Sequence, residues 1–360
     1  MRPAKVAVRV IALAAGSVGL LFLAALAFLV LRGGDSRAEE RSDRIIPLTL
    51  TAESIDRFNI VGERQDLFGS LEWVGGFVLN DRTDRLGGLS SLSVLDGGRR
   101  MISVSDDGTE FNADILRDGD GRPVDVDRPA LRQLRVLKQR MRYRSDMDTE
   151  GFDVSHQPGG DIAYVSFEAS PRVAFAPIDP DGWIGPLRKM VLPSAVEAVN
   201  GNAGFETIVA APAGSPLAGL LIAIAETDPD DGGLSPGWIF RQGRIDQRDA
   251  LSFSVVQSDG YSITDGAFMP NGNLVLLERR FGISIGIGMR MRMIEAADIR
   301  PGAKLEGRVL IEANLADEID NMEGLSVWTD DAGATRLSVV SDDNHSFLQR
   351  MLYLEFKLVR

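Results

Sequence analysis

The sequence predicts an all-β protein, a six-bladed β-propeller preceded by one N-terminal transmembrane or signal helix. Three observations support this prediction: five copies of a two-strand pattern, further strand-forming segments at both ends of the repeat region, and an uncharged apolar run near the N-terminus. The composition is 44% hydrophobic and 25% charged, which is typical of a globular chain and indicates a folded core along most of the 360 residues.

The first element is the apolar run. Residues 10–31 contain no charged side chain and are long enough to cross a bilayer as a helix. Arg2, Lys5 and Arg9 precede the run, as expected for the cytoplasmic flank of a membrane segment. Residues 1–32 are therefore interpreted as a signal-anchor that holds the protein in the inner membrane and places its body in the bacterial periplasm.

A second interpretation of the N-terminus stays open. Ala25-Leu26-Ala27 has the small-residue pattern of a signal-peptide cleavage site, and cleavage there predicts a secreted protein. In both cases residues 33–67, which begin polar and mixed in charge, are interpreted as a linker that leads into the main domain.

The main domain, residues 68–358, is defined by the repeat. Each copy combines a Gly-containing turn, a short strand rich in Val, Ile or Leu, a second turn of the Gly, Pro or Asn type, and a second strand that ends on an acidic residue. The shared glycines are 53 to 63 residues apart, which is too long for two strands and is typical of a four-stranded blade. These glycines are Gly88, Gly151, Gly204, Gly266 and Gly324.

The number of blades follows from the repeat length. With a mean spacing of 59 residues, the 328 residues after the apolar run hold about 5.6 units. A sixth blade is therefore expected from the two ends, with residues 71–79 pairing with residues 351–358 to close the ring and remove exposed sheet edges. Residues 283–293 alternate strictly between apolar and polar, which predicts a half-buried strand with Arg290 and Arg292 on one face.

Charge and composition exclude several classes of function. Residues 33–360 hold 35 basic and 52 acidic residues, a net charge of −17, which disfavours nucleic-acid binding. The chain has no cysteine and two histidines, so disulfides, thiolate chemistry and a three-histidine zinc site are excluded. The surplus of carboxylates instead suits a hard cation such as Ca²⁺.

The acidic residues of the repeat are candidate metal ligands because the inner strands of a propeller converge on a central channel. One set lies beside the shared glycines and the other at the end of the following strand, so each set is expected to gather in space. Carboxylates brought together in this way repel one another, and a bound Ca²⁺ would relieve the repulsion. The candidate metal ligands are Asp106, Asp107, Glu168, Glu226, Asp265, Glu278, Glu323, Asp342 and Asp343, together with Glu150. Glu206, two residues after the shared Gly204, also belongs to the set beside the glycines.

The same residues have a structural interpretation, in which they accept hydrogen bonds from turn amides or pair with arginines. The arginines that could serve either as these partners or as a clamp for an anion are Arg279, Arg280, Arg290, Arg292 and Arg350. His345 follows an acidic pair and is a candidate acid or base. No G-x-S-x-G motif is present, so a Ser-His-Asp triad is not expected.

Seven short motifs in the repeat region carry a resemblance to a known family. They are Gly87-Gly88-Leu89-Ser90-Ser91-Leu92, Ser105-Asp106-Asp107-Gly108, Asp148-Thr149-Glu150-Gly151-Phe152, Thr264-Asp265-Gly266-Ala267-Phe268, Leu277-Glu278-Arg279-Arg280, Asn321-Met322-Glu323-Gly324-Leu325 and Ser341-Asp342-Asp343-Asn344, the last followed by Gln349-Arg350. In this order they resemble the "esterase-like activity of phytase" family, the phytase-like domain of bacterial exported proteins. The resemblance implies a propeller and export, and it implies no specific substrate.

The functional hypothesis is a metal-assisted hydrolase acting on a small anionic substrate such as a phosphate ester, with Ca²⁺ or another divalent cation as cofactor. Its candidate catalytic residues are Glu150, Arg279, His345 and Arg350. Two alternatives remain open. One is a non-catalytic periplasmic propeller that binds a ligand or an envelope protein, and the other is a lactonase-like metal-dependent propeller.

Overall fold

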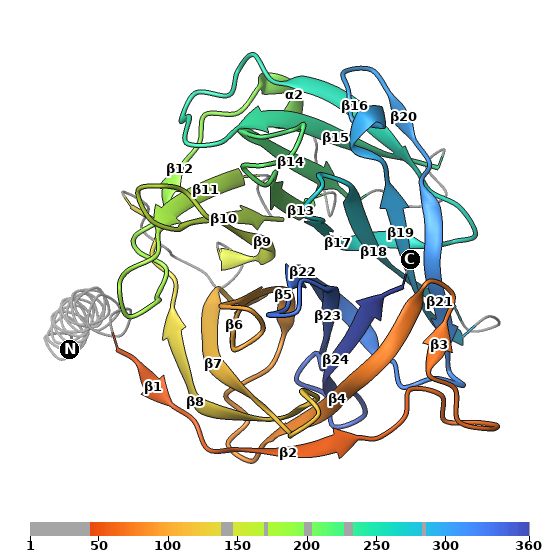
Figure 1. The fold of residues 1–360 in the computed structure, drawn as a ribbon. Coiled ribbons are helices and arrows are strands. Elements are labelled where there is room, and N and C mark those ends of the chain that lie inside the picture. The colour runs from red at the N-terminus through yellow and green to blue at the C-terminus, as the bar shows by residue number, and fades with distance from the viewer. Residues whose placement is uncertain are drawn as a thin grey trace, which may run out of the picture. The chain divides into compact units, whose positions relative to one another are not determined.

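The computed structural model describes residues 44–137, 147–168, 172–197, 204–226, 233–282 and 286–359. The described strands form five antiparallel sheets arranged as blades around a centre (Figure 1). The predicted membrane or signal segment at 10–31 lies outside the described residues and stays a prediction. Among the residues that are described, no helix is long and apolar enough to span a membrane.

The three innermost strands of each blade are consecutive in the chain, and each blade is described from its innermost strand outwards. Blade 1 comprises β5 (Leu89–Leu95), β6 (Arg100–Ser105), β7 (Thr109–Arg117) and β8 (Pro123–Gln133), with β1 (Ile46–Pro47) outside. Blade 2 comprises β9 (Thr149–Ser155), β10 (Ile162–Phe167), β11 (Arg172–Pro177) and β12 (Arg188–Lys189). Blade 3 comprises β13 (Phe205–Ala210), β14 (Leu220–Ala225), β15 (Leu234–Arg241) and β16 (Leu251–Val256), with β20 (Lys304–Leu305) added in parallel.

Blade 4 comprises β17 (Ser262–Phe268), β18 (Leu274–Gly282), β19 (Gly286–Ile294) and β21 (Arg308–Asn314). Blade 5 comprises β22 (Asn321–Thr329), β23 (Thr335–Asp342), β24 (Met351–Leu358), β4 (Leu71–Asp81) and β2 (Leu50–Ile55), and β3 (Leu67–Phe68) pairs with β4. The only helical segments of the described residues are α2 (Ser194–Glu197) and a 3₁₀ turn (Ala296–Asp298). The inner strands β5, β9, β13, β17 and β22 surround the centre of the ring (Figure 1).

The expectation of six blades was wrong, although the closure that led to it was correct. β4 does pair with β24, in antiparallel register from Leu71↔Leu358 to Leu79↔Met351. The blade that they share is the fifth repeat itself, because β24 continues directly from β22 and β23. The fractional count of 5.6 units came from long loops and from outer strands such as β2 and β20, and not from a further blade.

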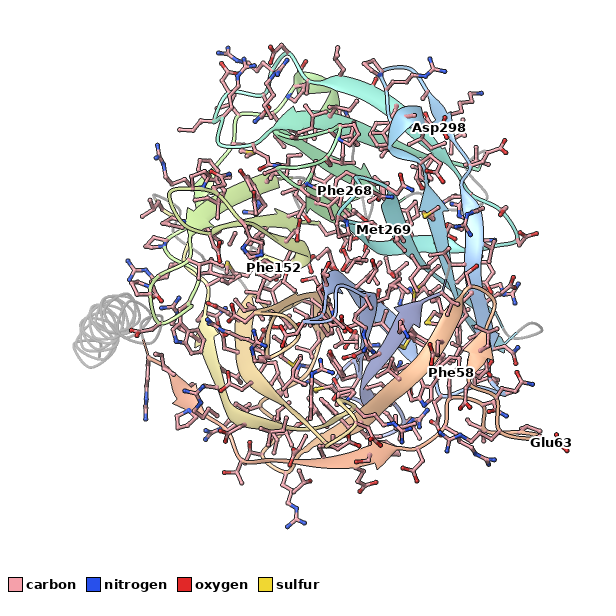
Figure 2. The ribbon with its side chains drawn as sticks, viewed as in Figure 1. Phe58, Glu63, Phe152, Phe268, Met269 and Asp298 are labelled. Carbon is pink, nitrogen blue, oxygen red and sulfur yellow. The ribbon has the colours of Figure 1, made fainter. Side chains whose placement is uncertain are left out.

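The hydrophobic core is divided among the spaces between blades. Five clusters of buried side chains are present in the described residues, and each one joins two neighbouring blades. Phe58 and Met269, which Figure 2 labels, belong to the cluster between blades 4 and 5. Because each blade buries both faces against its neighbours, an inner strand such as β5 carries apolar or small residues on both faces.

Candidate functional site

The inner strands share one irregularity close to their N-terminal ends. In each blade the pairing between the first and second strand shifts by one residue, at or beside the same point of the repeat. Such a bulge leaves a residue unpaired and redirects its side chain. The residues at the five bulges are Ser90, Glu150, Glu206, Thr264 and Glu323.

A second set of equivalent residues lies where each second strand meets its bulge. Each of them directly follows the residue of the second strand that pairs just before the bulge. In blade 1, for example, Ser105 pairs with Leu89, and Asp106 follows Ser105. These five residues are Asp106, Glu168, Glu226, Arg279 and Asp342. We call the two sets together the acidic mouth, which therefore contains seven carboxylates and one arginine.

Burial and mutual repulsion dominate the electrostatics of the acidic mouth. Glu206 is only 7% exposed, and no hydrogen bond or ion pair to it is found among the described residues. Burial is the main cause that raises the pKa of Glu206 well above its usual value, and the charges of Glu150 and Glu226 raise it further. The pKa of Glu150 is raised well above normal by burial first and then by Glu323 and Glu168. Among the residues that the structure describes, the positive charge close to these carboxylates does not offset their burial and mutual repulsion.

Arg279 provides part of the missing charge. Its Nη1 lies 2.5 Å from Oε1 of Glu323 and 2.5 Å from Oδ1 of Asn321. Burial nevertheless raises the pKa of Glu323 to about 8, against the opposing effect of Arg279. Burial likewise raises the pKa of Asp342 to about 6.

One group of carboxylates meets the geometric requirement for a metal ion. Ligand oxygens of Asp148, Glu150 and Glu168 lie within 4.8 Å of one another. Two oxygens that bind one Ca²⁺ at about 2.4 Å are at most about 4.8 Å apart, so the spacing of these three oxygens is compatible with one shared ion. Because the donors are all carboxylates, the group suits a hard cation.

A pocket of about 440 Å³ adjoins the acidic mouth in blade 4. Its lining includes Glu226, Arg279, Arg280 and Phe281, and Phe281 is 79% exposed. The Arg280 guanidinium lies 4.6 Å from the centre of the Tyr261 ring, and its buried Nε has no hydrogen-bond partner. The pocket therefore offers two arginines and an exposed aromatic ring beside the carboxylates.

Several predicted residues lie in the acidic mouth or at its rim. Glu150, Glu323, Asp106, Glu168, Glu226, Asp342 and Arg279 belong to the mouth as described above. His345 is exposed and close to Asp106, and it lowers the pKa of this residue against the larger effect of burial and the charge of Asp107. The Asp343 carboxylate accepts hydrogen bonds from the amides of Gly88 and His345, so it stabilises the rim.

Other predicted residues are held in structural contacts. Asp265 is fully buried and accepts hydrogen bonds from the amides of Gly266 and Leu325, both at 2.7 Å. The Asp107 carboxylate accepts hydrogen bonds from the hydroxyls of Ser105 and Thr109 within its turn.

Two further predicted residues, Glu278 and Arg350, are held in ion pairs. Both carboxylate oxygens of Glu278 are bound by buried arginines, Oε2 by Arg290 at 2.6 Å and Oε1 by Arg292 at 2.5 Å. This confirms that Arg290 and Arg292 share a face of their strand. Arg350 binds Glu318 at 2.6 Å, and its backbone amide donates to Asp320.

Asp148 was not among the predicted carboxylates, and Glu206 was predicted beside the shared glycines but not as a metal ligand. Asp148 lies two residues before Glu150, and Glu206 lies two residues after the shared Gly204. The signal for both was their short distance from a repeat glycine. The sequence did not show that the bulge falls at Glu206, so its access to the channel became evident only from the strand register.

Comparisons with solved structures find matches of low sequence identity. One match is the propeller of Dos1, at 9% identity and a TM-score of 0.34, covering 84% of this chain and 82% of the other. Another is a thermostable family-43 glycoside hydrolase, at 12% identity and a TM-score of 0.43, covering 75% of this chain and 89% of the other. No curated protein matches the chain.

The comparison with protein families is more specific. The phytase-like family, described as esterase-like activity of phytase, matches residues 84–345. This range contains all five inner strands and every residue of the acidic mouth. It confirms the resemblance that the motifs indicated, and the chain belongs to the phytase-like family.

Proposed function

We propose that the acidic mouth binds a divalent cation, with Ca²⁺ as the first choice, and that the protein uses it to hydrolyse a small anionic ester such as a phosphate ester. The observation that carries this proposal is the close approach of the Asp148, Glu150 and Glu168 oxygens. Unpaired Glu206 supports it, since a nearby cation would offset the cost of burying carboxylates without partners.

The residues around this cation site suit an anionic substrate. Arg279 and Arg280 line the adjacent pocket, and guanidinium groups bind phosphate oxygens at two points. A bound cation would polarise the phosphoryl or carbonyl oxygen of the ester. The exposed ring of Phe281 would cover an apolar part of the substrate.

The experiment is a hydrolysis assay on purified protein with para-nitrophenyl phosphate and, for comparison, para-nitrophenyl acetate. After chelation, added Ca²⁺ is expected to restore hydrolysis of the phosphate ester. Glu168→Gln is expected to lower the Ca²⁺-dependent rate by roughly tenfold or more, because it removes one of the clustered oxygens. Glu53→Gln, on the exposed face of outer strand β2, is the matched control and is expected to keep the rate.

Two outcomes would contradict the proposal. Hydrolysis that is equally fast in chelator would show that the cation is not involved. Ca²⁺ binding without hydrolysis of either ester would favour the alternative of a non-catalytic binding propeller.

A further inference from the structure

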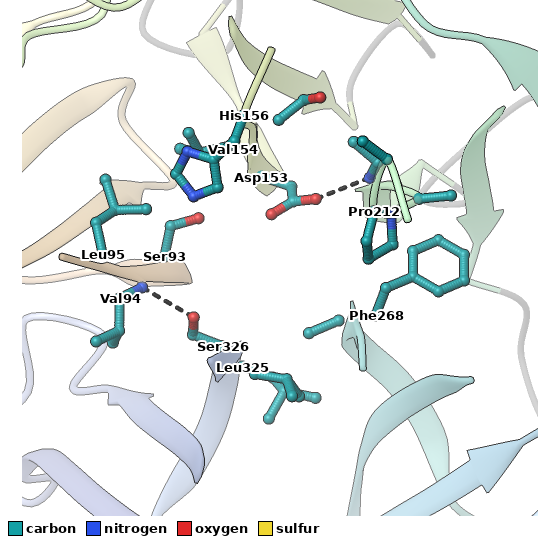
Figure 3. A pocket seen from close by; sticks show the side chains of 16 residues that line it. Ser93, Val94, Leu95, Asp153, Val154, His156, Pro212, Phe268, Leu325 and Ser326 are labelled. Carbon is teal, nitrogen blue, oxygen red and sulfur yellow. Dashed lines mark hydrogen bonds between the residues drawn. The ribbon is translucent and has the colours of Figure 1, made fainter. Parts of the chain in front are cut away.

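A second pocket lies closer to the C-terminal ends of the inner strands than the acidic mouth does. It has a volume of about 220 Å³ and is lined by residues of all five inner strands and the turns that follow them (Figure 3). Asp153, in its wall, follows Glu150 by three residues in the same strand. Three residues of extended chain span about 10 Å, so this pocket is separate from the acidic mouth.

Two polar groups of the pocket retain free hydrogen-bonding capacity. Asp153 Oδ2 accepts a hydrogen bond from the amide of Ala210 at 2.7 Å, which fixes the carboxylate in the wall (Figure 3). The Ser93 side chain is 3% exposed, and its buried hydroxyl has no partner among the described residues. By contrast, the Ser326 hydroxyl is occupied by the amide of Val94 at 2.8 Å.

Asp153 is the acidic side chain of the pocket. Among the described residues of the lining, the other ionisable side chain is His156, and no lysine or arginine is present. His156 is exposed at the rim, where its Nδ1 lies 2.8 Å from Oδ1 of Asp161. Pro212, Phe268 and Leu325 add apolar side chains around the opening (Figure 3).

We propose that this pocket binds a small organic cation, a primary ammonium carried on a compact apolar body. The Asp153 carboxylate is the counter-ion, and the Ser93 hydroxyl accepts a second hydrogen bond from the ammonium. An anion is disfavoured because the half-buried Asp153 carboxylate would face it, with no lysine or arginine among the described residues of the lining. The volume is below the usual 300–1,000 Å³ of ligand pockets, so the ligand is small.

The experiment compares three probes of one shape and different charge: benzylamine, benzyl alcohol and benzoate. Their binding to the purified protein is measured by ligand-observed NMR and by calorimetry at pH 8, above the pKa of about 7 to which burial raises Asp153. Benzylamine is expected to bind at least tenfold more tightly than the alcohol, and benzoate least. Asp153→Asn is expected to remove this preference and weaken benzylamine by tenfold or more, while its amide oxygen still accepts the Ala210 hydrogen bond.

Ser93→Ala provides a second variant in case Asp153→Asn does not fold, and a loss of several-fold in benzylamine affinity is expected. Glu168→Gln at the acidic mouth is the matched control and is expected to leave benzylamine binding unchanged. Equal affinity for the three probes, or no binding of benzylamine, would overturn the proposal. The same holds if benzylamine binds equally well to the wild-type protein and to Asp153→Asn. None of these results depends on the cation site or on hydrolysis.

Discussion

At the scale of single residues, Asp265 and Glu323 show how one position of register decides what a buried carboxylate does. Glu323 occupies a bulge and reaches the acidic mouth, whereas Asp265 directly follows the bulge at Thr264 and binds the Leu325 amide of the next blade. Asp265 therefore joins blades 4 and 5 at their inner strands. Its contribution is to stability and not to the cation site.

Asp265→Ala is expected to lower the free energy of unfolding by about 2 kcal/mol, because it leaves the Leu325 amide buried without an acceptor. Urea unfolding measures this change. Asp265→Asn keeps an oxygen acceptor and is expected to cost less. If the alanine variant instead lost Ca²⁺ binding while keeping its stability, Asp265 would belong to the cation site after all.

To predict which carboxylates face the channel, the positions of the bulges must be known, and the sequence does not mark them. The repeat predicts that Glu150, Glu168 and Glu323 gather, since each lies beside a recurring glycine or a strand end. Oxygens of Glu150 and Glu168 lie within 4.8 Å of one another, and the charge of Glu323 raises the pKa of Glu150 after the larger effect of burial. The repeat did not separate Asp265 from this group. A bulge changes by one residue which side chains of a strand face the channel, and it has no distinct sequence signal.

At the scale of strands, blade 4 depends on a buried cluster of charges. Glu278 of β18 is fully buried between Arg290 and Arg292 of β19, and Arg290 also lies 4.2 Å from the centre of the Tyr261 ring. This cluster ties the second strand of the blade to the third. Its stability depends on keeping both signs of charge together.

Glu278→Gln is expected to lower the free energy of unfolding by about 3 to 5 kcal/mol, because two guanidinium groups lose their buried counter-ion. A variant that replaces all three charged residues, Glu278→Leu with Arg290→Met and Arg292→Met, is expected to recover most of this loss. Denaturant titration of both variants checks the prediction. A Glu278→Gln protein as stable as the wild type would show that the cluster contributes little.

The recurring glycines reflect how closely the inner strands approach one another. A Cβ at Gly324 would lie 2.8 Å from the backbone carbon of Ser91, and one at Gly151 would lie 2.8 Å from the backbone oxygen of Glu206. Both neighbours are backbone atoms of the next blade, which cannot move aside easily. Glycine at these two positions therefore permits the contact between blades.

Gly324→Ala is expected to reduce the free energy of unfolding by about 1 to 3 kcal/mol through overpacking. Gly159→Ala is the matched control, since a Cβ there meets no atom within 4 Å, and a change below about 0.5 kcal/mol is expected. Thermal or denaturant unfolding of the two variants gives the comparison. Equal stability of both variants would contradict the role assigned to Gly324.

Strands and their closure were easier to predict than the number of blades. The paired turns predicted the hairpins, and the alternation at 283–293 predicted the strand observed from Gly286 to Ile294. The blade count was wrong because it depended on dividing a length by a mean spacing. Loops and short outer strands lengthen that spacing without marking a blade boundary, and the sequence does not distinguish them from a further repeat.

At the scale of the whole molecule, the buried carboxylates predict how stability depends on pH. Burial is the main cause that raises the pKa values of Glu110 and Asp153 to about 7, as it raises that of Glu323 to about 8. Between about pH 4 and pH 8 the folded protein thus holds protons that the unfolded chain has released, so the free energy of unfolding falls as the pH rises. Each pKa unit corresponds to about 1.4 kcal/mol, so Glu110 alone contributes a loss of about 3 kcal/mol.

Urea unfolding in chelator at pH 5 and pH 8 checks this expectation. The wild-type protein is expected to be several kcal/mol less stable at pH 8, and Glu110→Gln is expected to show a smaller difference because its amide does not titrate. An increase in stability from pH 5 to pH 8 would contradict the expected direction.

The central proposal is that some of the carboxylates responsible for the net charge of −13 form a cation site at one mouth of the channel. Thermal unfolding at neutral pH with millimolar Ca²⁺ and with chelator tests it most directly, because a ligand that binds only the folded state stabilises it. Ca²⁺ is expected to raise the Tm of the wild type and of Glu53→Gln by about 5 °C, as tight binding corresponds to about 2 to 3 kcal/mol. The shift is expected to disappear in Glu150→Gln and Glu168→Gln, and an unchanged wild-type Tm, or an equal shift in all four proteins, would contradict the account.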